Sequence, residues 1–284
     1  MRPSRLALAL LLLSGCFSPI RGPLLEALAA PTDAPGPEPP TCNARPVNLA
    51  FQFDPATTDG DRALMREALK LARSYFPLRF PRFVRYSYAG ERYICFPDHH
   101  IEPVKTTAEI PPHTGIAFYR PGEGITVYIA TSYWRNATES YRYTVMFHEA
   151  YHWYQELASK SEQTLNGFRR TNPLWLIEGT AEWFGHEAAV HFGFYPSMDD
   201  ARAYEASRLR HGAKELKSFE MRDRPSGDAY ALFFTAVDRL IRDHGGIGAL
   251  RRYWAFEDDD VDWRVVFRES FGISVAKFYG EFDV

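Results

Sequence analysis

The stretch "ESYRYTVMFHEAYHWYQELASK" (residues 139–160) decides how this chain is organised. It contains no proline or glycine, and Thr138 precedes it as an N-cap, so it predicts one long helix. His148 and His152 are four residues apart, so they share one helical face and can point two imidazoles at one metal ion. Four bulky residues surround them: Phe147, Tyr151, Trp153 and Tyr154. Such a helix is expected to be buried, and buried histidines need partners.

A second helix is predicted in "NPLWLIEGTAEWFGHEAAV" (residues 172–190), with Asn172 as its cap and Pro173 at its first position. Glu178 and Glu182 are four residues apart, so they also share one face. Two carboxylates on an apolar helix need a cation or a donor nearby. Antiparallel packing of the two helices satisfies both sets of groups, and Glu178 is then the best candidate for the third protein ligand of a catalytic zinc site.

The spacing of these groups resembles that of a known family. "HEAYH" (148–152) is followed by "WLIEGTAEWF" (175–184), with 25 residues between His152 and Glu178, as in the gluzincin metallopeptidases, the group of thermolysin and aminopeptidase N. The resemblance is closest to the broad set of peptidase-MA-like domains. It implies one Zn²⁺ per chain, held by His148, His152 and Glu178. It also implies that Glu149 is the general base and that Glu182 orients a ligand histidine.

The resemblance extends, less specifically, over residues 120–284. "DAYALFFTAVDRLIRDHGGIGALRRYW" (228–254) looks like the downstream helix of the family, and "FGISVAKFYGEF" (271–282) looks like its closing segment. Gluzincins supply a further donor to the reacting carbonyl oxygen from such a downstream segment. Tyr230 is the candidate for this role. Three histidines are rivals: His186, His191 and His211.

The N-terminus predicts export and lipid anchoring. "MRPSR" carries two arginines, and "LALALLLL" (6–13) is too short to span a membrane, as in a secretory signal peptide. It runs into "LSGC" (13–16), which resembles the lipobox of bacterial lipoproteins and marks Cys16 for lipidation. Cleavage at "ALA" (27–29) is the alternative. We predict a signal peptide in residues 1–15, a lipidated, proline-rich tether in 16–41, and a zinc metallopeptidase-like domain in 42–284.

Two further cysteines, Cys42 and Cys95, remain after the predicted lipidation site. An oxidising compartment favours a disulfide between them. Two cysteines alone are a weak pattern, so two unpaired thiols are an equal alternative.

The order of the elements predicts an α+β fold, with a small mixed sheet and one helix first and a mostly helical half after them. Strands are expected at 47–53, 82–88 and 92–96, and "PGEG" (121–124) predicts a hairpin turn. A helix is expected over 59–76, stopped by Pro77. The second half then carries the zinc site.

We therefore predict an extracytoplasmic, membrane-anchored zinc peptidase of the bacterial cell envelope. The net charge of −3 gives no polycationic surface, so nucleic acid is not an expected partner. An extended peptide substrate is expected to pair with the strand "GITVYIAT" (124–131). Two alternatives stay open: a non-catalytic scaffold lipoprotein stabilised by zinc, and a gluzincin-like hydrolase of a non-peptide bond. Cleavage specificity and oligomeric state stay open too.

Overall fold

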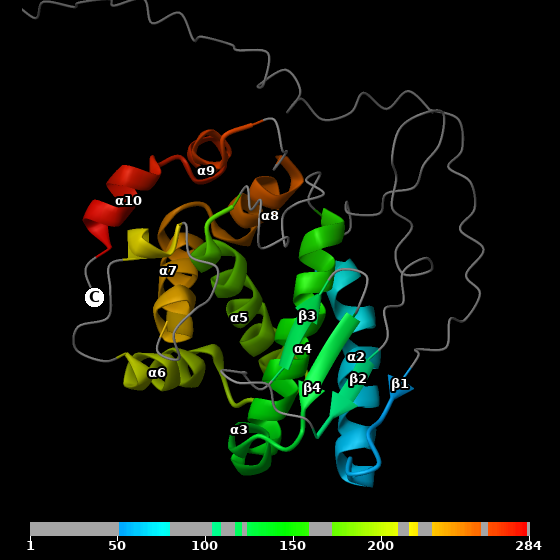
Figure 1. Cartoon of the computed structure of the whole chain (residues 1–284). Coiled ribbons are helices and arrows are strands. Elements are labelled where there is room, and N and C mark those ends of the chain that lie inside the picture. Colours follow the sequence, from blue (N-terminus) through cyan, green and yellow to red (C-terminus); the bar gives the residue numbers. More distant parts are fainter. Residues whose placement is uncertain are drawn as a thin grey trace, which may run out of the picture. The chain divides into compact units, whose positions relative to one another are not determined.

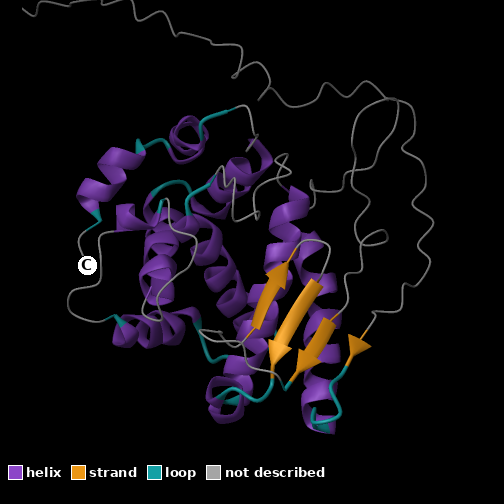
Figure 2. Ribbon diagram, viewed as in Figure 1, coloured by secondary structure: helices purple, strands orange, loops and turns teal. Residues whose placement is uncertain are grey.

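The computed structural model describes residues 51–79, 104–108, 117–120, 124–158, 172–209, 216–220, 229–256 and 261–282. Within these residues the protein has an α+β fold, with a small sheet followed by a mostly helical half (Figure 1; Figure 2). Several predictions lie outside the described residues: the signal peptide, the tether, Cys16, Cys42, Cys95, His211 and the strands at 82–88 and 92–96.

The elements follow one another in a fixed order of strands and helices. The strands are β1 (Phe51–Gln52), β2 (Val104–Thr107), β3 (Ala117–Arg120) and β4 (Gly124–Tyr128). The helices are α2 (Asp59–Arg79), α3 (Ser132–Asn136), α4 (Glu139–Ala158), α5 (Leu174–His191), α6 (Met198–Arg208), the 3₁₀ helix η1 (Leu216–Phe219), α7 (Ala229–Asp243), α8 (Gly246–Phe256), α9 (Trp263–Phe271) and α10 (Val275–Glu281). No helix in the described part of the chain is long and apolar enough to cross a membrane.

The sheet is mixed, with the strand order β1-β2-β4-β3. β1, β2 and β4 run parallel, and β3 pairs antiparallel with β4, as the hairpin prediction required. β4 lies between β2 and β3, so the backbone groups on both of its sides are already paired. The prediction that a substrate pairs with β4 is therefore wrong. Among the described strands β3 is the edge strand on this side (Figure 2).

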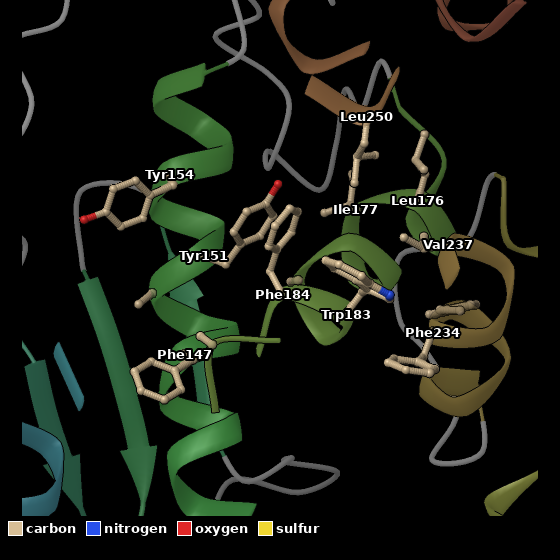
Figure 3. Packing of buried hydrophobic residues seen from close by; sticks show 14 of the residues in the cluster. Phe147, Tyr151, Tyr154, Leu176, Ile177, Trp183, Phe184, Phe234, Val237 and Leu250 are labelled. Atoms are coloured by element: carbon tan, nitrogen blue, oxygen red, sulfur yellow. The ribbon is translucent and has the colours of Figure 1, made fainter. Parts of the chain in front are cut away.

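Helix α4 is the centre of the packing. It contacts α2 and β3 as well as α5, and α5 in turn contacts α7 (Figure 1). The Tyr151 ring of α4 stacks on the Phe184 ring of α5, with ring centroids 4.5 Å apart (Figure 3). The Phe76 ring of α2 lies 4.8 Å from that of Tyr154. These aromatic contacts fix the sides of α4 and α5 that face each other, which also fixes the faces that carry the polar residues.

Two glycines let α5 approach its neighbours closely. A Cβ atom at Gly179 would lie 2.5 Å from the Phe233 carbonyl oxygen of α7. A Cβ atom at Gly185 would lie 2.9 Å from the Thr144 carbonyl oxygen and 3.3 Å from the Cβ of His148, both on α4. Any larger residue at either position would push a helix backbone away. The two glycines therefore set the spacing of the three helices around His148.

Two predicted helix ends differ from those in the structure. Helix α2 continues through Pro77 to Arg79, so this proline does not stop it. A proline close to a helix end disturbs little, because the helix has few further hydrogen bonds to lose there. Pro173, not Asn172, is the N-cap residue of α5, and Leu174 is its first helical residue. Thr138 does cap α4, since its Oγ1 accepts a hydrogen bond from the Tyr141 N–H at 3.2 Å.

The stability of the fold is expected to depend on pH through Glu187 of α5. This residue is only 9% exposed. Burial raises the pKa of Glu187 from 4.5 to about 7, and the positive charge of Arg251 opposes this only in part. Because the folded pKa exceeds the unfolded one, the favourable contribution is present below pH 4.5 and is lost as the pH rises through about 7.

We therefore predict that Glu187→Gln raises the free energy of unfolding more at pH 8 than at pH 5. The difference between the two pH values should be up to about 3 kcal/mol. Denaturant unfolding of variant and wild type at both pH values measures this difference. The exposed Glu139, changed to glutamine in the same way, serves as the control and should give no such pH-dependent gain. An equal effect of Glu187→Gln at both pH values would contradict the prediction.

Candidate metal centre

Helix α4 brings His148 and His152 together, as their spacing predicts. The two residues are each 6% exposed, and their Nε2 atoms lie 3.1 Å apart. The rings stand nearly perpendicular, with an interplanar angle of 81° and centroids 4.8 Å apart. The two Nε2 atoms thus converge on one point from different directions.

Glu178 of α5 completes the group. Its Oε2 lies 3.4 Å from the Nε2 of His148 and 3.4 Å from the Nε2 of His152. Metal bonds of about 2.0–2.1 Å in a tetrahedral arrangement place neighbouring donor atoms about 3.3 Å apart. The triangle of donor atoms, with sides of 3.1, 3.4 and 3.4 Å, has these dimensions and could hold a metal ion.

The tautomers of both histidines suit a metal. Nδ1 of His148 donates to Glu182 Oε2 at 2.8 Å, since a carboxylate only accepts. Nδ1 of His152 donates to Gln155 Oε1 at 2.9 Å, because the amide nitrogen of Gln155 donates to the Ile177 carbonyl at 3.1 Å. In the neutral form of each histidine, Nε2 then carries the lone pair, so both Nε2 atoms can bind a metal ion next to the Glu178 carboxylate.

The charges around the site favour a cation. Burial alone would lower the pKa of His148, but hydrogen bonds to Glu178 and Glu182 hold this pKa well above its usual range. Burial alone would raise the pKa of Glu178, but the charges and hydrogen bonds of His152 and His148 hold it well below its usual range. Both shifts have the same cause: the carboxylates favour positive charge on His148, and the histidines favour negative charge on Glu178.

Two further residues predicted for the site lie beside it. Glu149 follows His148 on α4 and is 6% exposed. Tyr230, at the start of α7, has its ring centroid 5.9 Å from that of His148, at an interplanar angle of 61°. Burial, together with the charges of Glu178 and Glu149, raises the pKa of Tyr230 well above 10.0, so its hydroxyl keeps its proton and can donate it in a hydrogen bond.

A second group of residues that could hold a metal ion begins at the Nδ1 side of His148 and consists of Glu182, His186 and Glu205. It already contains a cation, because the Arg208 guanidinium donates to both oxygens of Glu205 at 2.8 Å. A metal ion there would have to lie next to this guanidinium and would be repelled by it. Of the two groups found among the described residues, the first is therefore the candidate metal centre.

The structure brings together six residues that the sequence predicted: His148, Glu149, His152, Glu178, Glu182 and Tyr230. Two rival donors are placed differently. His186 is fully buried against Glu205, and His191 is an exposed residue at the end of α5 whose ring lies 4.6 Å from that of Tyr75.

Three residues that contact the site were not predicted from the sequence: Gln155, Glu205 and Arg208. Gln155 lies three residues after His152, and this helical spacing was a usable signal. Glu205 and Arg208 carried no such signal, because they lie on a different helix, α6, and no helical spacing relates them to Glu182.

Comparisons with protein-family models, with curated proteins and with solved structures find no match to this chain. The relation to gluzincins therefore stays a prediction from the "HEAYH" and "IEGTAEWF" stretches. Any function has to be argued from the geometry of the chain itself.

Proposed function

We propose that this protein is a zinc-dependent peptidase. The observation that carries the proposal is the triangle of His148 Nε2, His152 Nε2 and Glu178 Oε2, with the buried carboxyl group of Glu149 on the same helix turn. A structural metal site usually has four protein ligands and needs no base. Three ligands leave one position open, and a neighbouring carboxylate supplies a base, which is the arrangement of a hydrolytic site.

The donor set favours zinc. Two imidazole nitrogens and one carboxylate oxygen are the ligands of many catalytic zinc sites. Calcium and magnesium prefer sites built from oxygen atoms alone. The outer hydrogen bonds support the same choice, since both ligand histidines donate their Nδ1–H to a side-chain oxygen, of Glu182 or Gln155.

The residues divide the chemistry among them. When bound, zinc lowers the pKa of a water molecule toward neutrality and polarises a carbonyl group. Glu149 takes a proton from the attacking water and returns it to the leaving amine as the peptide bond breaks. The Tyr230 hydroxyl donates a hydrogen bond to the carbonyl oxygen as negative charge develops on it. The raised pKa of Tyr230 keeps this donor protonated at neutral pH.

An extended substrate is best accommodated along β3. This strand is paired with β4 on one side and contacts α4, the helix that carries both histidines. An edge strand can add a peptide through backbone hydrogen bonds, which is a common mode of peptide recognition. Alternating N-methylated peptides test this assignment. Methyl groups on the nitrogens that face β3 should abolish cleavage, and unchanged cleavage would contradict the assignment.

We further propose that the enzyme works outside the cytoplasm and that a lipid on Cys16 anchors it to a membrane. The support is the short apolar run at 6–13 followed by "LSGC". Labelled fatty acid should be incorporated into the wild type and not into Cys16→Ala. Incorporation into both would count against lipidation at this residue.

Tyr230→Phe is expected to lower kcat by about 10²–10³-fold, since one preformed donor to the developing charge is lost. Metal content should not change, because the phenol is not among the three ligands. Steady-state kinetics and metal analysis measure the two quantities. Tyr133→Phe is the control, since Tyr133 is 67% exposed on α3 and should leave both values as in the wild type. An unchanged kcat would remove Tyr230 from the proposed mechanism.

The proposed function is tested with a mixed peptide library and the full chain. Peptide cleavage is expected, is lost after chelation, and returns when one equivalent of zinc is added. The new termini, read by mass spectrometry, give the cleavage preference. Zinc binding without any cleavage would favour a scaffold or a non-peptide substrate.

A further inference from the structure

Glu182 lies next to three further residues of α5 and α6: the buried His186 and Glu205, and the partly exposed Arg208. Glu182 uses its two oxygens differently: Oε2 accepts from His148 Nδ1 at 2.8 Å, and Oε1 faces His186 and Arg208. Both of these donors lie closer to Glu205. The His186 Nε2 is 3.1 Å from Glu205 and 3.8 Å from Glu182. The Arg208 Nη1 is 2.8 Å from Glu205 and 3.9 Å from Glu182.

These distances make Glu205 a competitor for the donors that would otherwise bind Glu182. Glu205 and His186 are both fully buried, so neither can turn to solvent. Aromatic rings surround His186, with those of Tyr195 and Phe234 at 5.2 and 5.4 Å. The Arg208 guanidinium lies 5.4 Å from the Tyr204 ring centroid. The cluster is therefore held in place by its packing, and Glu182 keeps one oxygen for His148 alone.

We propose that Glu205, with His186 and Arg208, is a positioning device that keeps Glu182 hydrogen-bonded to His148 Nδ1 and so strengthens metal binding at His148 Nε2. A carboxylate that holds Nδ1–H fixes the tautomer and the ring orientation and increases the basicity of the other nitrogen. The inference rests on the metal centre of the proposed function and is independent of peptide hydrolysis.

Glu205→Gln is the variant that tests this inference. The substitution keeps the size of the side chain and removes its charge. Arg208 then has Glu182 as its nearest carboxylate, and we expect it to draw Glu182 away from His148. Zinc affinity, measured by competition with a chromogenic chelator, should fall by about 10–100-fold, the range found for lost supporting partners. The visible absorption of the Co²⁺-loaded variant should also change, because it reports the ligand geometry directly.

The control is Asp238→Asn on α7. Asp238 is 3% exposed and accepts from the Arg202 Nε and the Arg242 Nε, both at 3.0 Å, so it is, like Glu205, a buried carboxylate paired with guanidinium groups. It also accepts from Trp183 Nε1 of α5 at 3.1 Å. This variant should lose stability and keep the zinc affinity and Co²⁺ spectrum of the wild type.

A double-mutant cycle decides whether Glu205 acts through Glu182. Glu182→Gln should itself weaken zinc binding, and adding Glu205→Gln should then cost nothing further. Additive losses, an unchanged affinity in Glu205→Gln, or an equal loss in Asp238→Asn would each overturn the inference. A wild type that binds no zinc would overturn it together with the proposed function. The expected losses in a protein that cleaves no peptide would support the inference and refute the peptidase.

Discussion

Glu149→Gln is expected to lower peptide hydrolysis by about 10²–10⁴-fold, the range that general-base catalysis contributes. Glutamine has nearly the same shape as glutamate and cannot take a proton from water. The variant should keep one zinc ion per chain, because the donor triangle consists of His148, His152 and Glu178. Hydrolysis and metal content, measured on the same preparation, separate loss of the base from loss of the site.

Glu139→Gln is the matched control for Glu149→Gln. It makes the same chemical change on the same helix, at an exposed position in the first turn of α4. It should retain wild-type hydrolysis. Full activity in Glu149→Gln would show that the reaction does not use this carboxylate, and loss of zinc would show that Glu149 also supports the metal.

Glu178→Gln is expected to weaken zinc binding by more than about 100-fold. Loss of a residue that only supports a ligand costs about 10–100-fold, and Glu178 is a ligand itself. The variant loses the negative charge at the point where the two Nε2 atoms converge, 3.4 Å from each. A neutral amide oxygen is a poorer ligand, and hydrolysis should disappear with the metal. Chelator competition measures the affinity.

The matched control for Glu178→Gln lies on the same helix. Glu187→Gln makes the same change at another largely buried position of α5, outside both metal-binding groups. Its zinc affinity should equal that of the wild type. Wild-type affinity in Glu178→Gln would mean that another residue supplies the third ligand.

The helical half of the fold was predictable because its signals are local. The uninterrupted run at 139–160 and the spacing of Glu178 and Glu182 need only helix geometry to be read. Helices α4 and α5 confirm these predictions. The sheet was harder, because β2 consists of four residues and pairs with strands distant in the sequence. The residues of "GITVYIAT" alone do not indicate that β4 pairs with β2, and this pairing makes β4 a central strand.

In the candidate site, too, some residues could be grouped from local spacing and others only from the packing of helices. His148, His152 and Glu149 are fixed by one helix, so sequence spacing was enough to group them. The place of Tyr230 depends on how closely α7 approaches α5, and the backbone contact at Gly179 decides this. Glu205 and Arg208 act across a helix interface, so only the packing of α6 against α5 connects them to His148.

We propose that His148, His152 and Glu178 bind one zinc ion. Diffraction from zinc-loaded crystals, collected on both sides of the zinc absorption edge, tests it most directly. We expect a single anomalous peak about 2.0–2.1 Å from both Nε2 atoms and from a Glu178 carboxylate oxygen. A peak within the Glu182, His186 and Glu205 group, or no peak at His148 and His152 in fully loaded protein, would contradict it.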